Sequence, residues 1–376
     1  MLSLYVHIPF CRERCSYCDF FLVTKPGFVE RFFEALDVET VSKAGLLAGR
    51  TIGAIHFGGG TPSLVPVSHI AGWLSQVAGL AGLSAETEVT LEANPEDIND
   101  TTKLDQLRAA GINRLSIGVQ SFSDRKLRAL GRSHTAKDAV RTVTEVLERF
   151  PSVSIDLICG AEEERAGEWD GDLQTALRLS PQHVSVYMLT LEEKTRLWRN
   201  VHKGFRVLPD EEEQVSMYLQ AMERLSGAGY LHYEISNYAL EGHHSRYNLA
   251  SWMREPYIGF GPSAHSFLVT GQSEIRCSNV CSLGKYLADP AGAVDFSEEL
   301  TEAQRFDEEV FLSLRIRRPL AVEFLRKGNK LGLQHLDALI ARLREKGWIG
   351  IDGGNVLLTD TGFLFADLVA AELLSE

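Results

Sequence analysis

YVHIPFCRERCSYCDFF, from Tyr5 to Phe21, joins an apolar run to three cysteines, Cys11, Cys15 and Cys18. The residues LSLYVHI that lead into it are rich in aliphatic and aromatic side chains, which is typical of a buried β-strand. The chain has six cysteines in all, so half of them lie in this one loop. A strand that ends in three crowded thiols predicts a site at the carboxyl end of that strand.

Strand-like runs of this kind alternate with amphipathic stretches over the first two-thirds of the chain. The expected strands are LSLYVHI, IGAIHFGGG, EVTLEA, RLSIGVQ, VSIDLI and HVSVYML. The stretches between them carry apolar residues three and four apart, as helices do. Because parallel neighbouring strands need helical crossovers, these units predict an α/β fold with a parallel sheet. Six units fall short of the closed eight-stranded barrel, so we expect an open, partial (βα)6 barrel.

Polar and glycine-rich signals recur at the carboxyl ends of these strands, where such sheets bind their ligands. The cysteines follow the first strand, and GGGTP, residues 58–62, follows the second. Glu92 and Asn94 lie at the end of the third strand, Gln120 ends the fourth, and Asp156 lies late in the fifth. Loops without a function would place polar residues equally at both ends, so this bias predicts one shared site.

Composition narrows the class of protein. The 376 residues are 44% hydrophobic and 24% charged, which is ordinary for a globular protein with a large core. We expect a soluble, cytoplasmic protein, because neither a secretion signal nor an apolar run long enough for a membrane span is found. Thiols stay reduced in the cytoplasm, so clustered cysteines indicate metal binding or catalysis. The net charge of −13 argues against a nucleic-acid partner.

The pattern divides the chain into three parts. Residues 1–240 are expected to form the partial barrel. Residues 241–300 include HHSRYNLASWMREPYIGFGPSAHSF, rich in aromatic residues, His and Gly, and are interpreted as a connector or lid. Residues 301–376 predict three helices, a hairpin in GWIGIDGGNVLLTD and a closing helix, the order of a winged-helix-like α+β unit. That unit holds ten basic and twelve acidic residues, which favours a structural or docking role over DNA binding.

Two kinds of metal site are compatible with the three thiols. A structural zinc ion needs four closed ligands, usually in two separated pairs, and His7 could supply the fourth. His7 lies in the apolar strand, however, where a single histidine is more often packed and hydrogen-bonded. A four-iron, four-sulfur cluster bound by only three thiolates leaves one iron open for a small molecule.

The arrangement C-x3-C-x2-C after the first strand, with Tyr17 just before the last cysteine, resembles the signature of radical S-adenosylmethionine proteins. The resemblance implies that Cys11, Cys15 and Cys18 hold a [4Fe–4S] cluster whose open iron is chelated by S-adenosylmethionine. It also implies that an electron from the cluster breaks the sulfonium bond and yields a 5′-deoxyadenosyl radical. The glycine triplet would let the backbone come close to that ligand.

Further motifs resemble the oxygen-independent coproporphyrinogen III oxidase group, which includes the HemW-type haem chaperones. They occur in order along nearly the whole chain: YVHIPFC, HFGGGTPS, EANPE, LSIGVQSF, SIDLI and YIGFGPSAHSF. Matched position by position, the resemblance implies contacts to S-adenosylmethionine from Tyr5, Tyr17, Gly59, Gly60, Thr61, Glu92, Gln120, Arg132 and Asp156.

Within this group, the oxidases resemble the present sequence but carry Gly-Cys after the third cysteine and a long N-terminal segment. Here Asp19 and Phe20 follow Cys18, and the sequence starts shortly before Tyr5. Both features favour the HemW-type branch, which binds haem and passes it on. The implied partners are haem or another tetrapyrrole, a reductant protein, a haem-accepting protein at the membrane and a second copy of the chain. A radical enzyme such as the oxidase is the alternative, and a DNA-binding redox regulator is a third function, disfavoured by the acidic balance.

The sequence departs from this branch at the segment Cys-x-His-Asn-x-x-Tyr-Trp. It reads SRYNLASW, so Ser245 and Tyr247 stand where the Cys and His are expected. Haem iron accepts axial His, Cys, Met or Tyr ligands, so the candidates in this region are Tyr247, His243, His244 and His265.

Two further features concern an acidic segment and the three cysteines outside the cysteine loop. The segment LICGAEEERAG, after the fifth strand begins, has acidic residues where a Gly-Leu-Pro-Gly turn is usual. Cys159, Cys277 and Cys281 are interpreted as small apolar residues, because two further thiols do not suffice for a second cluster.

Overall fold

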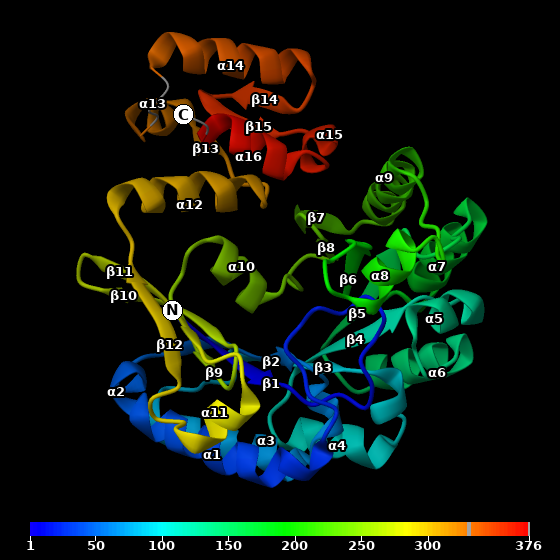
Figure 1. Ribbon diagram of the computed structural model, residues 1–376, viewed down its shortest axis with the longest axis vertical. Helices are drawn as coiled ribbons and strands as arrows, with labels where there is room; N and C mark the ends of the chain where they lie inside the picture. The colour runs from blue at the N-terminus through cyan, green and yellow to red at the C-terminus, as the bar shows by residue number, and fades with distance from the viewer. Residues whose placement is uncertain (329–331, 375–376) are drawn as a thin grey trace.

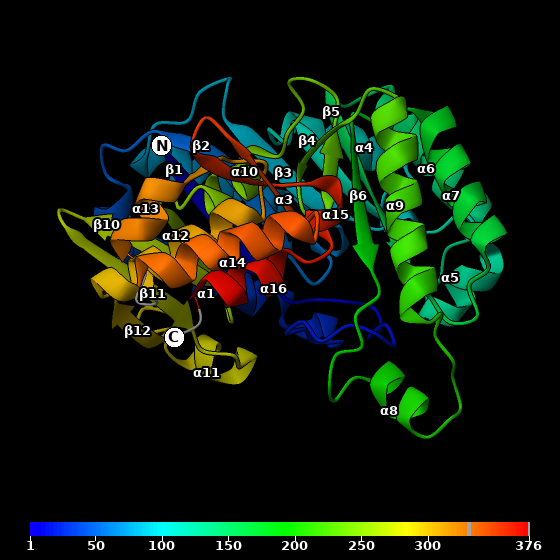
Figure 2. The ribbon, with the colours of Figure 1, turned by 90° about the horizontal axis from the view of Figure 1, so that it is seen from above.

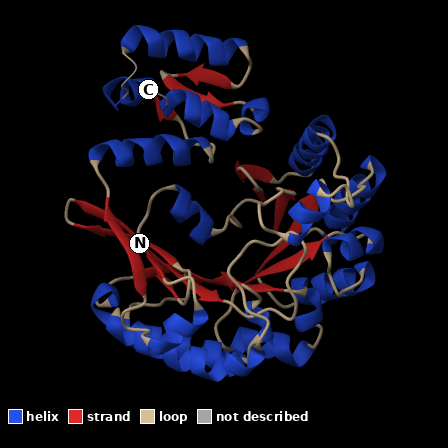
Figure 3. Ribbon diagram, viewed as in Figure 1, coloured by secondary structure: helices blue, strands red, loops and turns tan. Residues whose placement is uncertain are grey.

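The computed structural model describes residues 1–328 and 332–374. Within these ranges the strands form a large twelve-stranded sheet and a small three-stranded one. The large sheet is curved, with helices on its convex side and the C-terminal unit standing over its open, concave side (Figure 1). Figure 3 shows the same division into an inner layer of strands and an outer layer of helices. The chain is therefore organised around one sheet with two unlike faces.

Six parallel strands form the centre of the large sheet and lie side by side in chain order. They are β1 (Leu2–Ile8), β2 (Ile52–Gly59), β3 (Glu88–Ala93), β4 (Arg114–Gln120), β5 (Ser152–Cys159) and β6 (His183–Met188). Every neighbouring pair is parallel, so all six carboxyl ends lie at one edge of the sheet. The predicted partial (βα)6 barrel is confirmed.

Helices connect these strands, and most of them cover the convex face (Figure 1). They are α1 (Val29–Ser42), α2 (Ala44–Leu47), α3 (Val67–Leu80), α4 (Thr101–Ala109), α5 (Asp124–Leu130), α6 (Ala136–Leu147), α7 (Ala166–Leu179), α8 (Arg196–His202) and α9 (Glu211–Gly227). One-turn 3₁₀ helices start at prolines in Pro26–Phe28, Pro62–Leu64 and Pro95–Asp97. Local signals set several ends: the Thr135 side chain accepts from Asp138 N at the start of α6, and Gly131 is left-handed after α5.

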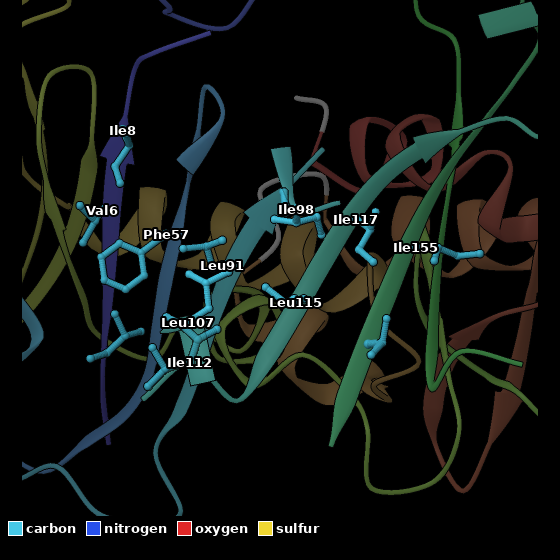
Figure 4. Close-up of a cluster of buried hydrophobic side chains, with 14 of the residues drawn as sticks. Val6, Ile8, Phe57, Leu91, Ile98, Leu107, Ile112, Leu115, Ile117 and Ile155 are labelled. Atoms are coloured by element: carbon cyan, nitrogen blue, oxygen red, sulfur yellow. The ribbon is translucent and has the colours of Figure 1, made fainter. Parts of the chain in front are cut away.

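The main core lies between the parallel strands and these helices. Val6, Phe57, Leu91 and Leu115 are fully buried, one on each of the first four strands. Figure 4 shows these side chains in a row across the sheet, with Leu107 packed against them. Side chains alternate in direction along a strand, so the residues between them point to the concave face. The side chains of Tyr5, His56 and Glu92 therefore point into the interior of the barrel.

Residues 241–300, which the sequence analysis interprets as a connector or lid, mostly extend the large sheet. Helix α10 (Arg246–Trp252) lies on the concave face (Figure 1). The extension comprises β9 (Tyr257–Phe260), β10 (His265–Thr270), β11 (Ser273–Asn279), α11 (Leu283–Ala288) and β12 (Val294–Glu299). Strand β9 pairs in parallel with β1. This pairing covers the sheet edge that β1, as the first strand of the barrel, would otherwise leave exposed.

The opposite edge and the C-terminal unit complete the fold. After β6 the sheet continues with β8 (Asn237–Ala239) and β7 (Leu231–Glu234), both antiparallel. The C-terminal unit comprises α12 (Glu302–Leu314), β13 (Leu320–Ala321), α13 (Val322–Gly328), α14 (Leu333–Glu345), β14 (Ile349–Asp352), β15 (Asn355–Leu358), α15 (Asp360–Phe363) and α16 (Ala366–Leu374). It has its own apolar core and the order of elements that the sequence predicts.

Ion pairs join α12 to the barrel. The Glu308 carboxylate accepts hydrogen bonds from Arg276 on β11 and from Arg254 at the end of α10. None of the helices in the described ranges is both long and apolar enough to cross a membrane.

Candidate functional site

A cavity of about 450 Å³ opens at the carboxyl edge of β1 to β6. In Figure 2 the arrowhead of β6 points toward this edge, where the cysteine loop and α8 lie. The cavity brings together eleven of the twelve residues that the sequence assigns to the site: Cys11, Cys15, Cys18, Tyr17, Gly59, Gly60, Thr61, Glu92, Gln120, Arg132 and Asp156. Tyr5 does not line it, and lies deeper in the barrel.

Backbone hydrogen bonds shape the cysteine loop. Cys11 N donates to Val23 O over 3.0 Å, and Val23 N donates to Pro9 O over 2.7 Å, so the loop closes on itself. The Arg14 guanidinium donates to the carbonyls of Cys18 and Phe20 from the exposed side. The three thiols are thereby presented from one short, closed loop.

The glycine triplet supports this loop from below. Gly60 N donates to Ile8 O, and Thr61 N donates to Phe10 O. A Cβ on Gly60 would lie 2.7 Å from the carbonyl carbon of Pro9, and Gly59 has φ +102° with His7 directly against it. The glycines are therefore needed for the close approach of two backbone segments of the protein itself. This need exists without any ligand, whereas the sequence predicts close approach to the ligand alone.

Burial affects two of the three thiols in the cysteine loop. Burial raises the pKa of Cys11 to about 11, although a hydrogen bond with Thr61 lowers that pKa in part. Burial also raises the pKa of Cys18. Thiolates so placed need a cationic group to replace their protons. Across residues 1–328 and 332–374, no three His, Cys, Asp or Glu side chains converge on one point as zinc ligands must. In a cluster each thiolate binds a different iron, so the sulfur atoms need not converge.

His7 is also unavailable as a zinc ligand. Its Nε2 donates to the Phe21 carbonyl over 2.8 Å, so Nδ1 is the acceptor of this neutral ring. The Tyr5 hydroxyl, 3.2 Å away, donates to that Nδ1. Burial lowers the pKa of His7 and keeps the ring neutral. Both nitrogens are occupied, as the packed interpretation of this histidine expects.

Arg132 places a buried positive charge beside the cysteines. Its guanidinium donates to the Gly118 carbonyl over 2.9 Å and to the Asn94 side chain, and Nη1 lies 3.7 Å from Cys15 Sγ. Within the described ranges its buried Nε has no acceptor. A buried donor without a partner is costly, so an acceptor from a bound molecule would satisfy it. Asn94 was noted at the end of its strand but not assigned to the site.

A second polar pair behind Arg132 was missed by the sequence analysis. Glu96 accepts from Nδ1 of His134 at 3.0 Å, and Nε2 of His134 donates to Val119 O. Burial would raise the pKa of Glu96, but the His134 hydrogen bond and the charge of Arg132 outweigh it and lower that pKa to about 2. The motif EANPE contained Glu96, but only the fold brings His134 to it.

The interior of the barrel above the cavity is lined by stacked rings. Tyr247, on α10, stacks on His56 with centroids 5.1 Å apart and on Tyr5 with centroids 5.8 Å apart. His56 Nε2 donates to Glu92 Oε1, whereas its buried Nδ1 has no partner within the described ranges. Tyr5 therefore supports the wall of the site from behind.

Asp156 and Gln120 form the far wall of the cavity. Ser116 donates to the Asp156 carboxylate over 3.3 Å. Burial, with the neighbouring charge of Glu92, raises the pKa of Asp156 to about 6. Gln120 has φ +64°, which is uncommon for a residue other than glycine and turns the chain at the end of β4. Glu92, Asp156 and Arg132 are among the charged residues that line the cavity, a suitable set for a ligand with amino, hydroxyl and carboxylate groups.

The candidate axial ligands lie in different places. His243 contacts Ser152 and His244 packs edge-on against Tyr233, at or near the amino-terminal edge of the barrel, away from the cysteines. Tyr247 is buried in the ring stack. His265 begins β10, is exposed, and lies close enough to His7 to affect its charge. His265 is thus the candidate at the same edge as the cavity.

The acidic segment after β5 is paired rather than free in solvent. Glu162 pairs with Arg206, and Glu164 accepts from Lys126. Lys126 is fully buried and also lies 3.1 Å from Asp172. These pairs tie the segment to α5, to α7 and to the loop after α8. The cations that pair with Glu162 and Glu164 lie about 40 residues away in the sequence.

The remaining cysteines are free thiols. Cys159 is fully buried, as expected of a small apolar residue, whereas Cys277 is half-buried on β11 and Cys281 is exposed. Those two exposures differ from the expected burial. Cys277 lies on β11, near the sheet edge with only β12 beyond it, and Cys281 lies in the loop after β11.

Comparison with known proteins places the chain in a family. Residues 5–174 match the family model of the radical SAM superfamily. The chain is 33% identical to Heme chaperone HemW of Bacillus subtilis (strain 168), with the alignment covering 100% of both proteins. It is 42% identical over 70% of its length to the bovine protein Radical S-adenosyl methionine domain-containing protein 1, mitochondrial, and this match spans 60% of the bovine protein.

Among solved structures, coproporphyrinogen III oxidase (HemN) from Escherichia coli, a radical SAM enzyme, superposes with a TM-score of 0.85. It is 24% identical and the match covers 100% of this chain and 90% of the oxidase, which establishes a common fold. Membership of the superfamily implies a [4Fe–4S] cluster and S-adenosylmethionine, and the thiols and the polar cavity fit both. From its fold, its cysteine loop and its full-length similarity, the chain belongs to the radical S-adenosylmethionine superfamily and, within it, to the HemW family.

Proposed function

We propose that this protein is a haem chaperone of the HemW type, which binds haem and transfers it to a target protein in the cytoplasm or at the membrane. The observation that carries the proposal is the full-length similarity to a protein named Heme chaperone HemW. The match to the bovine relative spans 60% of that protein. The proposed haem function therefore concerns the present chain and not the remainder of the longer relative.

In this proposal Cys11, Cys15 and Cys18 hold the cluster, whose open iron would bind the amino and carboxylate groups of S-adenosylmethionine. Arg132 supplies a positive charge and an unpaired donor at the cavity wall. Glu92, held by His56, and Asp156 supply acceptors for the amino and hydroxyl groups of the ligand. Gly59 and Gly60 keep the cysteine loop against the end of β2.

We further propose His265 as the axial ligand of haem. Its ring is exposed, has no hydrogen-bond partner among the described residues, and lies close enough to His7, late in β1, to affect the pKa of that ring. Tyr247 is a poor candidate, because iron would need its phenolate, and burial raises the pKa of Tyr247 far above its usual range. A neutral histidine binds iron without losing a proton, and partial burial of the ring, together with the charge of Arg276, lowers the pKa of His265.

Haem titration followed by absorbance tests this assignment. His265→Ala should weaken haem binding by about tenfold or more, which corresponds to about 1.4 kcal/mol. The matched control His335→Ala, an exposed histidine on α14, should leave the affinity unchanged. Equal affinity in wild type and His265→Ala would disprove the axial role, and absence of saturable binding in the wild type would disprove the haem function.

A radical enzyme acting on a tetrapyrrole is the second candidate, favoured by the shared fold with the E. coli oxidase. The two functions separate in one assay. The reconstituted, reduced protein is incubated anaerobically with S-adenosylmethionine and coproporphyrinogen III. Multiple turnovers to protoporphyrinogen would favour the oxidase, whereas saturable haem binding without turnover is what the chaperone predicts.

A further inference from the structure

A basic island lies beside the cysteine loop of this acidic protein. We use that name for five exposed cations on α8 and its flanking loops: Lys194, Arg196, Arg199, Lys203 and Arg206. No acidic residue occurs from residue 194 to residue 209, although Glu193 and Asp210 border this segment and the whole chain has 51 acidic and 38 basic residues. So local an excess, against a net charge of −13, needs an explanation of its own.

The cations of the island are mostly free to bind a partner. Arg206 pairs with Glu162, and Arg199 donates only to a backbone carbonyl. Lys194, Arg196 and Lys203 have no ion pair with any other described residue. Ordinary surface cations in an acidic protein find carboxylates nearby, so unpaired cations of one sign create a positive field.

The island is joined directly to the loop that carries the cysteines. Leu197 N, in α8, donates to the carbonyl of Ser16 over 2.8 Å, and Ser16 lies between Cys15 and Cys18. Leu197 also belongs to the small apolar cluster against which Tyr17 packs. Figure 2 shows α8 beside the cysteine loop at the same edge of the sheet. A protein that binds the island is therefore brought next to the thiols.

Apolar side chains lie within the positive surface. Phe205 is 71% exposed and Val207 is 66% exposed, and both alternate with the cations Lys203 and Arg206 along the loop after α8. Exposed aromatic and aliphatic groups flanked by charges are typical of the centre and rim of a protein interface. Charge of one sign around such a centre steers a partner of the opposite sign.

From these observations we propose that the basic island is the docking surface for a small acidic one-electron carrier protein that reduces the cluster. The inference rests on the proposed function only in that the cysteines must hold an iron–sulfur cluster. The step transfers one electron: the reduced carrier is oxidised by one electron, the cluster is reduced by one, and no bond or proton is exchanged. The island holds the carrier at the loop where that electron must arrive.

Charge reversal of the island tests this proposal, with reduced ferredoxin, a small acidic iron–sulfur protein, as the probe. The variant Lys194→Glu/Arg196→Glu/Lys203→Glu should slow cluster reduction in stopped-flow by about tenfold or more at low salt and flatten its dependence on ionic strength. Ferredoxin affinity for the protein without its cluster, measured by calorimetry, should fall similarly. Photoreduced 5-deazariboflavin, an uncharged small molecule, should reduce both proteins at equal rates.

A matched control separates local docking from net charge. Lys137→Glu/Arg178→Glu/Arg344→Glu changes the net charge equally at exposed sites on α6, α7 and α14. We expect this control to keep the wild-type rate with ferredoxin. Equal slowing in both triple variants, or wild-type rates in the island variant, would disprove the docking surface.

Unchanged ferredoxin kinetics with loss of binding to phosphatidylglycerol vesicles would instead assign the island to an anionic membrane. Haem affinity, measured on the same proteins, should not change, so failure of this proposal is distinct from failure of the haem function.

Discussion

His56 Nε2 lies 2.9 Å from Glu92 Oε1 and joins the inner face of β2 to that of β3. Gly58, two residues further along β2, faces the same carboxylate, and a Cβ there would lie 2.8 Å from Glu92 Oε1. The carboxylate therefore occupies the space that any side chain at position 58 would need. One histidine and one glycine together hold Glu92 at the cavity wall.

Gly58→Ala should displace Glu92 and weaken binding of S-adenosylmethionine. Loss of one well-placed polar contact costs about 1–3 kcal/mol, so we expect an affinity about 5- to 150-fold lower. Equilibrium binding to the reconstituted protein measures it. The control Gly53→Ala, in the same strand, meets only the flexible side chain of Met1 and should bind normally. Wild-type affinity in Gly58→Ala would show that Glu92 does not contact the ligand.

The three thiols of the loop should bind about four irons per chain after anaerobic reconstitution. Cys15→Ala should lose the iron and its visible absorption, because two thiolates cannot hold the cluster. Cys277→Ala, on β11 and away from the loop, should retain both. Metal analysis and absorbance spectra report the result. Zinc in the anaerobically purified protein, without iron uptake, would contradict the cluster.

Lys126 should be essential for stability, because it neutralises two buried carboxylates. It is fully buried between Glu164 and Asp172, and removing one partner from such a group costs about 3–5 kcal/mol. Urea unfolding of Lys126→Met should show this loss, and Lys126→Met/Glu164→Gln/Asp172→Asn should recover part of it.

The more exposed pair nearby gives the control for Lys126. Arg125→Ala removes a partner of Glu168 at a side chain that is 40% exposed, and should cost about 0–1 kcal/mol. A loss in Lys126→Met no larger than in Arg125→Ala would mean that the buried carboxylates are already neutral.

Asp156 should make stability fall as the pH rises. Burial and the charge of Glu92 raise its pKa from 3.8 to about 6, so the folded protein holds this proton more tightly than the unfolded chain. The free energy of unfolding should therefore decrease between about pH 4 and pH 6 and stay level above that, by up to about 3 kcal/mol.

Urea unfolding at several pH values, without added ligands, measures the difference between Asp156→Asn and wild type. The variant should gain relative stability across this window. Asp105→Asn, at a side chain that is 73% exposed, should parallel the wild type throughout. A constant difference between Asp156→Asn and wild type from pH 4 to pH 7 would refute the raised pKa.

The local pattern of the sequence was sufficient for the central sheet and for the position of the three cysteines in one loop at its carboxyl edge. The runs at residues 2–8, 88–93 and 114–120 match β1, β3 and β4 residue for residue. Strand and helix periodicity is a property of adjacent residues, and the three cysteines lie within one loop. Parallel strands then place their carboxyl ends at a single edge whatever the details of packing.

Contacts between distant parts of the chain decided the rest. The edge of β1 is paired by β9, some 250 residues later, so a segment interpreted as a lid became part of the sheet. Glu164 needs Lys126, and Glu96 needs His134, partners separated by 38 residues. No local pattern records such pairings, because burial and charge neutralisation depend on which surfaces meet.

By itself, the sequence determined the six-stranded barrel and the cysteine loop, since short-range periodicity and motif spacing carry that information. The family resemblance supplied most of the candidate residues that line the cavity. Only the tertiary structure decided that Tyr247 is buried in a ring stack, that Gly60 serves the backbone of the cysteine loop, and that α8 brings unpaired cations beside Ser16. The physical reason is that exposure, pKa and docking depend on neighbours in space, which folding brings together from distant positions in the chain.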